Sequence, residues 1–269
     1  MIRVDRNDTN VGIISMEYDH QNNGMYSWNT RKYEHRINLE MIDGINHALD
    51  EVLDMDPPVS SLVFTGKGKF FCNGLDLLYI NTIEHETNAQ IQFQRSFERL
   101  LDRILTFPLY TIAAINGHAC AGGAMLALAF DHRIIVKNPK LLMFVPAVDL
   151  GLVYSKGMTL LMKERIPKHV LTQFLFLSKR FSVTELKRLV IVQDVVNENL
   201  NLVEYSCVVA SKLCADKFST QFKRDTLHRV KCITYEEIHT TLQNDNNMIE
   251  MGFTHGLWNS KGIAIKSML

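Results

Sequence analysis

Two short apolar runs, each ending in a glycine turn, constrain the fold of this chain more than any other feature. Residues 59–65 and 111–117 are apolar and contain β-branched side chains, which is typical of buried parallel strands. The first run leads into residues 66–77 (GKGKFFCNGLDL), the first turn, and the second into residues 116–124 (NGHACAGGA), the second turn. Because carboxyl ends of parallel strands meet at one edge, we expect both turns on one rim of a sheet, where ligands bind in open α/β folds.

Amphipathic helices are predicted beside these strands. Apolar residues recur at helical spacing over 37–53 and over 89–107, and each segment stops at prolines. A further helix is expected from the second turn to residue 130. Short strands are expected at 2–4, 11–16 and 132–136.

The second half of the chain has a different pattern. From about residue 155 the apolar spacing is helical, with no internal repeat and no low-complexity stretch. Helices that follow an α/β core cover that core or mediate assembly. The sequence therefore predicts a core over residues 1–195 and a C-terminal helical region, an assembly element or lid, over residues 196–269.

Composition excludes several classes of protein. Lys+Arg and Asp+Glu both number 29, so the net charge is zero, whereas nucleic-acid binders carry a basic excess. The five cysteines include no C-x-x-C pair, so neither a disulfide framework nor a zinc ribbon is predicted, and a reducing compartment fits best. The first residues hold no apolar run like that of a signal peptide, and no stretch reaches the ~18–20 apolar residues of a membrane span.

The two turns point to chemistry at backbone amides. Phe71 stands where a dinucleotide fingerprint needs its third glycine, and Gly-Lys-Ser/Thr is absent, so phosphate-loop motifs are excluded. In the first turn Gly74 lets the backbone present the amide of Leu75. The second turn exposes amides at the start of a helix, where the first N–H groups lack partners. Two such amides converging on one point form an oxyanion hole.

The chain resembles the crotonase superfamily, the enoyl-CoA hydratase/isomerase fold. The resemblance rests on FTGKGKFFCNGLDL, followed some forty residues later by AAINGHACAGGAMLALAFDHRI. Within that superfamily, residues 34–45 (EHRINLEMIDGI) and 146–152 (PAVDLGL) look most like the peroxisomal Δ3,Δ2-enoyl-CoA isomerases, especially the plant-type branch. The similarity covers roughly residues 10–165.

This resemblance implies an α/β fold, a crotonase-like spiral of ββα units, assembled as a homotrimer or hexamer through its C-terminal helices. It implies an oxyanion hole built from the amides of Leu75 and Gly122. It also implies that an acyl-CoA thioester is bound without any metal or other cofactor, by Arg36, Asn73, Gly74, Leu75, Asp76, Leu77 and Gly122, with Lys32 as a further phosphate contact.

This chain differs from the family at the positions of the catalytic base. Three positions carry the carboxylate in family members, and they fall here on Met125, Ala147 and Ser155. Asp149 is the nearest carboxylate in sequence and shares a side with Ala147 if that stretch is extended. The alternative is that Asp149 braces the turn that follows it.

Other candidate residues carry weaker signals. Tyr154, Lys156 and Glu164 are more remote alternatives to Asp149. His118 and Cys120 lie in the second turn, where a structural role or simple packing is the favoured interpretation of each. Glu84-His85-Glu86 and residues 236–239 (EEIH) lack the partner ligands of a metal site.

The sequence thus predicts an enoyl-CoA Δ3,Δ2-isomerase of fatty-acid β-oxidation. The alternative is a non-catalytic acyl-CoA-binding protein that has lost the base, and an enoyl-CoA hydratase comes third. Ser267-Met268-Leu269 resembles a variant of the peroxisomal Ser-Lys-Leu signal, which predicts a peroxisomal location, with cytoplasm or mitochondrion as alternatives.

Overall fold

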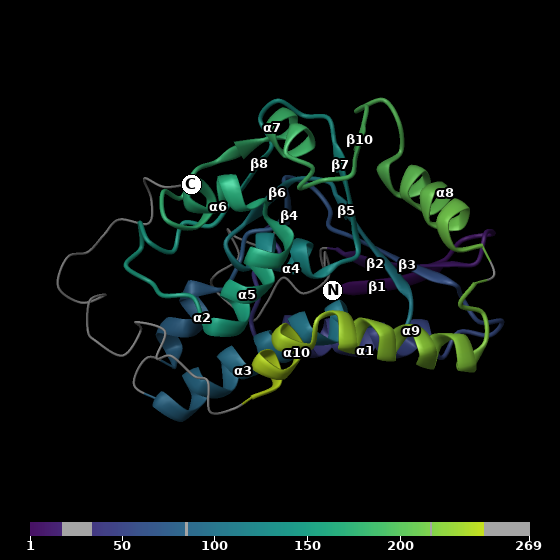
Figure 1. The fold of residues 1–269 in the computed structure, drawn as a ribbon, viewed down its shortest axis with the longest axis horizontal. Coiled ribbons are helices and arrows are strands. Elements are labelled where there is room, and N and C mark those ends of the chain that lie inside the picture. Colours follow the sequence, from purple (N-terminus) through teal and green to yellow (C-terminus); the bar gives the residue numbers. More distant parts are fainter. Residues whose placement is uncertain (18–33, 84–85, 216, 245–269) are drawn as a thin grey trace, which may run out of the picture.

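Two sheets form the centre of the protein (Figure 1). The computed structural model describes residues 1–17, 34–83, 86–215 and 217–244. The larger sheet has the order β1-β2-β3-β5-β7-β10, and the smaller one β4-β6-β8-β9. The strands of the larger sheet are β1 (Ile2–Arg6), β2 (Val11–Met16), β3 (Ser61–Thr65), β5 (Tyr110–Ile115), β7 (His132–Val136) and β10 (Asp194–Val196). Those of the smaller sheet are β4 (Phe70–Cys72), β6 (His118–Cys120), β8 (Leu142–Phe144) and β9 (Phe181–Ser182).

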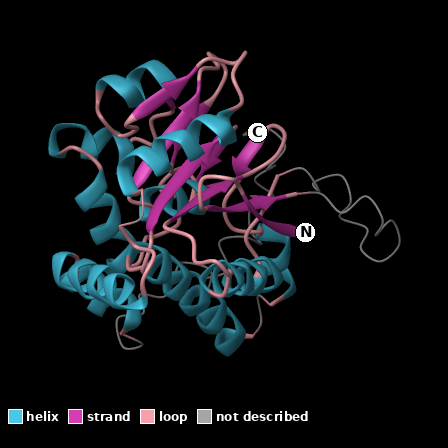
Figure 2. Ribbon diagram, turned by 90° about the vertical axis from the view of Figure 1, so that its right-hand side faces the viewer, coloured by secondary structure: helices cyan, strands magenta, loops and turns pink. Residues whose placement is uncertain are grey.

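Helices enclose both sheets (Figure 2). They are α1 (Leu39–Leu53), α2 (Leu77–Thr82), α3 (Thr87–Leu105), α4 (Gly122–Ala129), α5 (Lys156–Arg165), α6 (Lys168–Leu175), α7 (Val183–Arg188), α8 (Leu202–Cys214), α9 (Gln221–Thr234) and α10 (Glu236–Gln243). Helices α1, α3, α9 and α10 form a layer at the bottom of Figure 1, and α8 packs on β3, β5 and β7. Among the described residues, no helix is both long and apolar enough to cross a membrane.

The chain winds as a spiral of ββα units, which confirms the predicted fold class. Each unit places one strand in the larger sheet and the next in the smaller sheet, and a helix follows: β3, β4 and α3, then β5, β6 and α4, then β7, β8 and α5. Neighbouring strands β2, β3, β5 and β7 are parallel, as are β4, β6 and β8. Every residue of β3 is buried, because α8 covers one face of the larger sheet and the main core covers the other.

The predicted strands and helices agree with the structure where the apolar residues recur over a long enough segment. The strand over 11–16 and the one over 132–136 have the predicted bounds, and helices α1 and α3 lie within two residues of the predicted ones. The purely helical interpretation beyond residue 155 is wrong, because β9 and β10 add strands there. Strand β6 also stands where only a turn was predicted. The proposed core boundary at 195/196 falls inside β10.

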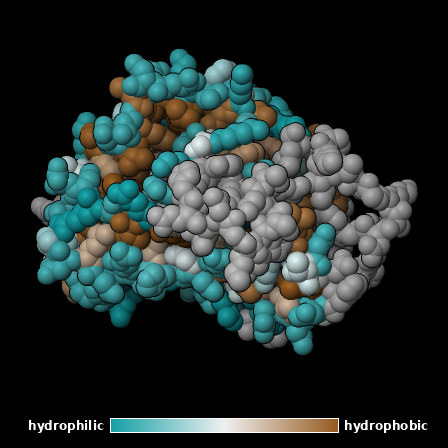
Figure 3. Space-filling view, turned by 180° about the vertical axis from the view of Figure 1, so that it is seen from behind, coloured by the Kyte–Doolittle hydropathy of each residue, from teal (hydrophilic) through white to brown (hydrophobic). Residues whose placement is uncertain are grey.

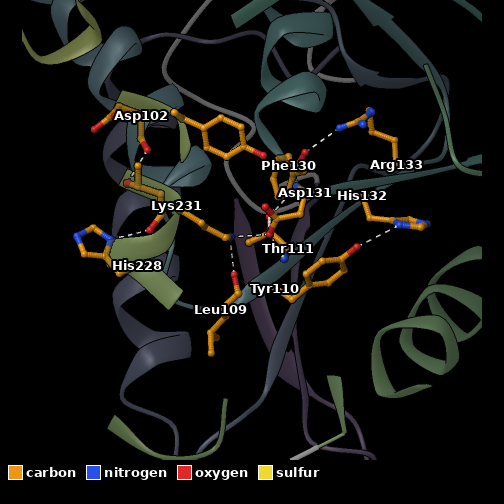
Figure 4. Close-up of polar contacts among 12 residues, drawn as sticks. Asp102, Leu109, Tyr110, Thr111, Phe130, Asp131, His132, Arg133, His228 and Lys231 are labelled. Carbon is orange, nitrogen blue, oxygen red and sulfur yellow. Dashed lines mark hydrogen bonds and ion pairs between the residues drawn. The ribbon is translucent and has the colours of Figure 1, made fainter. Parts of the chain in front are cut away.

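The C-terminal helices are attached to the core by buried polar contacts. Figure 4 shows Lys231 of α9 reaching Asp131 at the end of α4, with its ammonium donating to the Asp131 carboxylate at 2.6 Å and to the Leu109 carbonyl at 2.9 Å. The same carboxylate accepts from the backbone amide and hydroxyl of Thr111 in β5. Burial lowers the pKa of Lys231, while Asp131 opposes that shift. One carboxylate therefore joins α4, β5 and α9.

Helix α10 is fastened in a similar way. Asp102 of α3, which is 2% exposed, accepts from His239 at 2.8 Å and from Gln243 at 2.6 Å. Leu242 packs over Gly157 of α5 so tightly that a Cβ at Gly157 would lie 2.5 Å from it. Helix α10 therefore ties α3 to α5.

We predict that Lys231→Ala destabilises the protein by about 3–5 kcal/mol, because it leaves the buried Asp131 charge without its partner. Urea unfolding should show a lower midpoint with an unchanged slope. Arg229→Ala, an exposed change on the same helix, is the matched control and should alter stability by less than about 0.5 kcal/mol. Equal effects of the two variants would contradict the role assigned to Lys231.

Candidate active site

The first turn presents one backbone amide toward α4. The Ile37 amide donates to the Gly74 carbonyl and the Asp76 amide to the Ile37 carbonyl, both at 2.8 Å, so Leu75 pairs with Ile37 as in a parallel strand. Backbone groups of successive residues in such a pair point to opposite sides. The Leu75 amide therefore points away from Ile37, and it has no acceptor among the described residues.

The second turn presents another amide. Ala121 adopts φ 49° and ψ −121°, a region that non-glycine residues rarely enter, and its amide is held by the Phe144 carbonyl at 2.9 Å. Gly122 follows as the first residue of α4, so its amide has no partner within the helix. Strain at Ala121 thus accompanies an amide left free at a helix start.

Glycine lets the two turns touch. Gly74 has φ +84°, and a Cβ there would lie 2.9 Å from both the Ala121 Cβ and the Cys120 carbonyl oxygen, and 3.1 Å from the Gly122 nitrogen. Any larger residue at this position would push the turns apart. Asn116 adds a second link, because its side chain accepts from the Gly66 amide and donates to the carbonyls of Gly68 and Phe70. The free amides of Leu75 and Gly122 are brought together by these contacts.

Both residues line one cavity of about 150 Å³. Its walls are mostly apolar, with Phe97, Met125 and Met158 at its buried end and the half-exposed Val153 at its rim. The polar and charged side chains at the cavity are Arg36, Asn73, Asp149, Tyr154 and Arg180. Charge that developed on a ligand atom beside the two amides would be little screened by water.

The predicted thioester contacts separate into two groups. Arg36, Asn73, Leu75, Leu77 and Gly122 line the cavity. Gly74 and Asp76 do not, because Gly74 supports the turn and the Asp76 carboxylate caps α2 by accepting from the amides of Leu78 and Tyr79. Lys32 lies outside the described residues.

Arg36 and Asn73 are held by one carboxylate. The Arg36 Nε lies 2.6 Å from the Glu34 carboxylate, and the Asn73 amide donates to the same oxygen at 3.0 Å. Arg180 also lines the cavity, with its guanidinium 4.9 Å from the centre of the Phe144 ring. Two guanidinium groups therefore line the cavity.

In family members the catalytic carboxylate stands at one of three positions, which are Met125, Ala147 and Ser155 in this chain. Met125 and Ala147 line the cavity, so a carboxylate at either position would face a ligand. Ser155 is 1% exposed and caps α5, accepting from the Met158 amide at 3.2 Å.

Asp149 lines the cavity, but its backbone differs from the predicted one. Residues 147–151 form a turn and not an extended strand, with the Leu152 amide bonded to the Ala147 carbonyl at 2.8 Å. The alternation used to place Asp149 beside Ala147 is therefore wrong, although both residues reach the cavity. Among the described residues, Asp149 is the one carboxylate that lines it, and it is exposed.

Tyr154 contributes a neutral hydroxyl. Its O–H donates to the Val145 carbonyl at 3.2 Å, and burial, with a smaller contribution from Asp149, raises its pKa to about 12. Tyr154 therefore stays protonated near neutral pH and serves as a hydrogen-bond donor.

A second carboxyl group lies behind the cavity wall. Glu98 of α3 is 6% exposed, and burial raises its pKa more than the polar side chains of Ser155 and Gln94 and the charge of Arg95 lower it. Nothing in the sequence singles out this residue, because the helical spacing of Phe93, Phe97 and Leu101 runs past it unbroken.

The remaining candidates have structural roles. Burial raises the pKa of Cys120 to about 12, so its thiol is not ionised and is a poor nucleophile. The His118 ring accepts from the Leu142 amide at 3.2 Å and packs on Phe70. Within the described ranges, no cluster of three or more possible ligands could hold a metal ion. Residues 84 and 85 of the other candidate cluster lie outside those ranges.

Comparison with known proteins gives a consistent family. A family model described as enoyl-CoA hydratase/isomerase matches residues 27–257. Enoyl-CoA delta isomerase 3 of Arabidopsis thaliana is 30% identical over 193 residues, covering 71% of this chain and 81% of that protein. The peroxisomal enoyl-CoA delta isomerase 2 of the same plant is 32% identical over 195 residues, covering 69% and 79%.

Solved structures show the same fold at lower identity. An enoyl-CoA isomerase of Mycobacterium tuberculosis superposes with a TM-score of 0.70 at 22% identity, covering 91% of this chain and 95% of that one. An enoyl-CoA hydratase/isomerase family protein from Pseudomonas syringae gives 0.73 at 20% identity, covering 92% and 98%.

We predict that Gly74→Ala destabilises the protein more than Gly151→Ala does. Both glycines have positive φ, but a Cβ at Gly151 meets nothing within 4 Å. Gly151→Ala should cost only the backbone strain, about 1–2 kcal/mol. Gly74→Ala should cost about 1–3 kcal/mol more, because the methyl group collides with the second turn. Equal free energies of unfolding in urea would show that the turns are not pressed together.

Proposed function

This chain belongs to the enoyl-CoA hydratase/isomerase family, and from that premise we propose that it is an enoyl-CoA isomerase of the Δ3,Δ2 type. The substrate class is a 3-enoyl-CoA thioester arising in the oxidation of unsaturated fatty acids. CoA is part of the substrate, so the proposed reaction needs no separate cofactor.

The observation that carries this proposal is the pair of free amides at Leu75 and Gly122 beside an apolar cavity. Removal of a proton from C2 of a thioester leaves negative charge on the carbonyl oxygen. Two preorganised N–H donors at that oxygen stabilise the enolate, an effect worth several kcal/mol in other enzymes, about 2.7–4 for one donor.

The reaction then needs one proton carrier. A carboxylate takes the C2 proton, the double bond moves from C3–C4 to C2–C3 as the enolate collapses, and C4 receives a proton. Asp149 is the first residue to test as this carrier, since it is the carboxylate found at the cavity among the described residues. Tyr154 can donate a hydrogen bond within the same cavity.

A second candidate function is acyl-CoA binding without catalysis. The observation in its favour is that Met125, Ala147 and Ser155 place no carboxylate at the family positions. A hydratase is less favoured, because Met125 and Ala147 leave no pair of carboxylates at the cavity to position a water molecule.

The proposal includes an anion contact for CoA, an assembly and a location. Arg36 and Arg180 are suited to the phosphates of CoA.

A homotrimer or hexamer is supported by exposed apolar side chains on the C-terminal helices, including Val208, Leu213, Phe222 and Ile233. Figure 3 shows apolar residues reaching the surface of the back face among polar ones. A peroxisomal location is supported by Ser267-Met268-Leu269, which lies outside the described residues, and by the peroxisomal relative.

We predict that the purified protein converts 3-hexenoyl-CoA to 2-hexenoyl-CoA, measured by the absorbance of the conjugated product. Ala147→Glu should raise the rate, because it adds a carboxylate to the cavity wall at a family position. Loss of about 100-fold or more in kcat on Asp149→Asn would assign the proton transfer to Asp149.

Binding separates the two candidate functions. Octanoyl-CoA should raise the melting temperature in either case, since a ligand bound only by the folded state stabilises it. Binding with no turnover in the wild type and in Ala147→Glu would favour the non-catalytic function. No thermal shift at saturating octanoyl-CoA would contradict both.

A further inference from the structure

Glu98 is a buried carboxyl group that lies beside Ser155 and Gln94. It is 6% exposed, and none of the ion pairs formed among the described residues includes it. Burial of an ionised carboxylate without a paired cation costs several kcal/mol or forces the group to bind a proton. A carboxyl group held in such a place near a cavity is a candidate for proton transfer.

The face of α3 that carries Glu98 turns toward α5 and α10. Gln94, Glu98 and Asp102 are spaced by four residues, so they share one face of the helix. Asp102 binds His239 and Gln243 of α10, and Glu98 lies next to Ser155 at the start of α5. Asp102 thus has the structural role on this face, and Glu98 is left beside the cap of α5.

Residues next to Glu98 in α3 and next to Ser155 line the cavity. Phe97, the chain neighbour of Glu98, lines the cavity, and the Phe97 ring would lie 3.3 Å from a Cβ at Gly122. Tyr154, which precedes the α5 cap Ser155, and Met158 in the first turn of α5 line it too. Glu98 itself does not line the cavity, so its carboxyl group lies behind the wall that these residues form, whereas Asp149 is exposed to solvent.

Ser155 explains why a carboxyl group from α3 fits here. The serine side chain is short and caps α5 by accepting from the Met158 amide. The carboxyl group of Glu98 occupies the space beside that hydroxyl, approaching from the opposite helix.

We propose that Glu98, and not Asp149, is the proton carrier of this site. The inference rests on the proposed isomerase function. The Glu98 carboxylate takes the C2 proton of the bound 3-enoyl-CoA, the electron pair of that C–H bond forms the enolate, and the same carboxylic acid returns the proton to C4. Atoms and electrons balance without a further reactant. The side chain must turn past Phe97 to make contact with the ligand.

The test compares Glu98→Gln with Asp149→Asn in 3-hexenoyl-CoA turnover. Glu98→Gln should lower kcat by about 100-fold or more with KM nearly unchanged, because the amide cannot accept the proton. Asp149→Asn should lower kcat much less than Glu98→Gln does. Glu98→Asp, which keeps a carboxyl group, should have a higher kcat than Glu98→Gln. Glu204→Gln, the same change at an exposed residue of α8, is the matched control.

The melting temperature of each variant shows whether a loss of activity comes from the lost carboxyl group or from a less stable fold. Because an amide needs no desolvation of a charge and can still form hydrogen bonds, Glu98→Gln should leave the melting temperature unchanged or raise it. Full activity of Glu98→Gln, or a loss of activity accompanied by a lower melting temperature, would overturn the proposal. If the wild type binds octanoyl-CoA but turns over no enoyl-CoA, the isomerase function itself fails and Glu98 has no such role.

Discussion

The contact between the two glycine turns is the constraint on which the rest of this structure depends. Gly74 and the second turn can touch only because no side chain stands between them, and Ala121 accepts a strained backbone at the same place. The parallel strands β3 and β5 lead into the two turns, and helices α2 and α4 begin directly after them. The spiral of ββα units therefore serves to place two free amides beside one apolar cavity.

The C-terminal helices stabilise that arrangement from outside. Asp131, which follows α4, accepts hydrogen bonds from β5 and α9. Helix α4 begins at Gly122, whose amide is one of the two proposed donors. Asp102 holds α10 against α3, and α10 in turn packs on α5, whose Met158 forms part of the cavity wall. Polar contacts far along the sequence thus fix the helices that surround the site.

Sequence reasoning succeeded where the signal was local. The strands over 11–16 and 132–136 and the long amphipathic helices could be predicted from spacing, and the fold class from the resemblance. The role of the Leu75 and Gly122 amides stays a prediction. Sequence reasoning failed where pairing decides the structure: β4, β6 and β9 have only two or three residues and exist because neighbouring strands align them. Glu98 was missed for a similar reason, since only the folded chain reveals that this carboxyl group is buried and lies beside Ser155. Asp149 was placed by an alternation that the turn over 147–151 does not have.

The central claim is that the amides of Leu75 and Gly122 bind the thioester oxygen. Isotope-edited infrared spectroscopy of bound octanoyl-CoA carrying 13C at the thioester carbonyl tests it directly. Hydrogen bonds from two preorganised donors polarise the carbonyl group, so the account predicts a C=O stretching frequency clearly below that of the same 13C-labelled octanoyl-CoA free in solution. A bound ligand whose carbonyl frequency equals that of the free thioester would contradict the account.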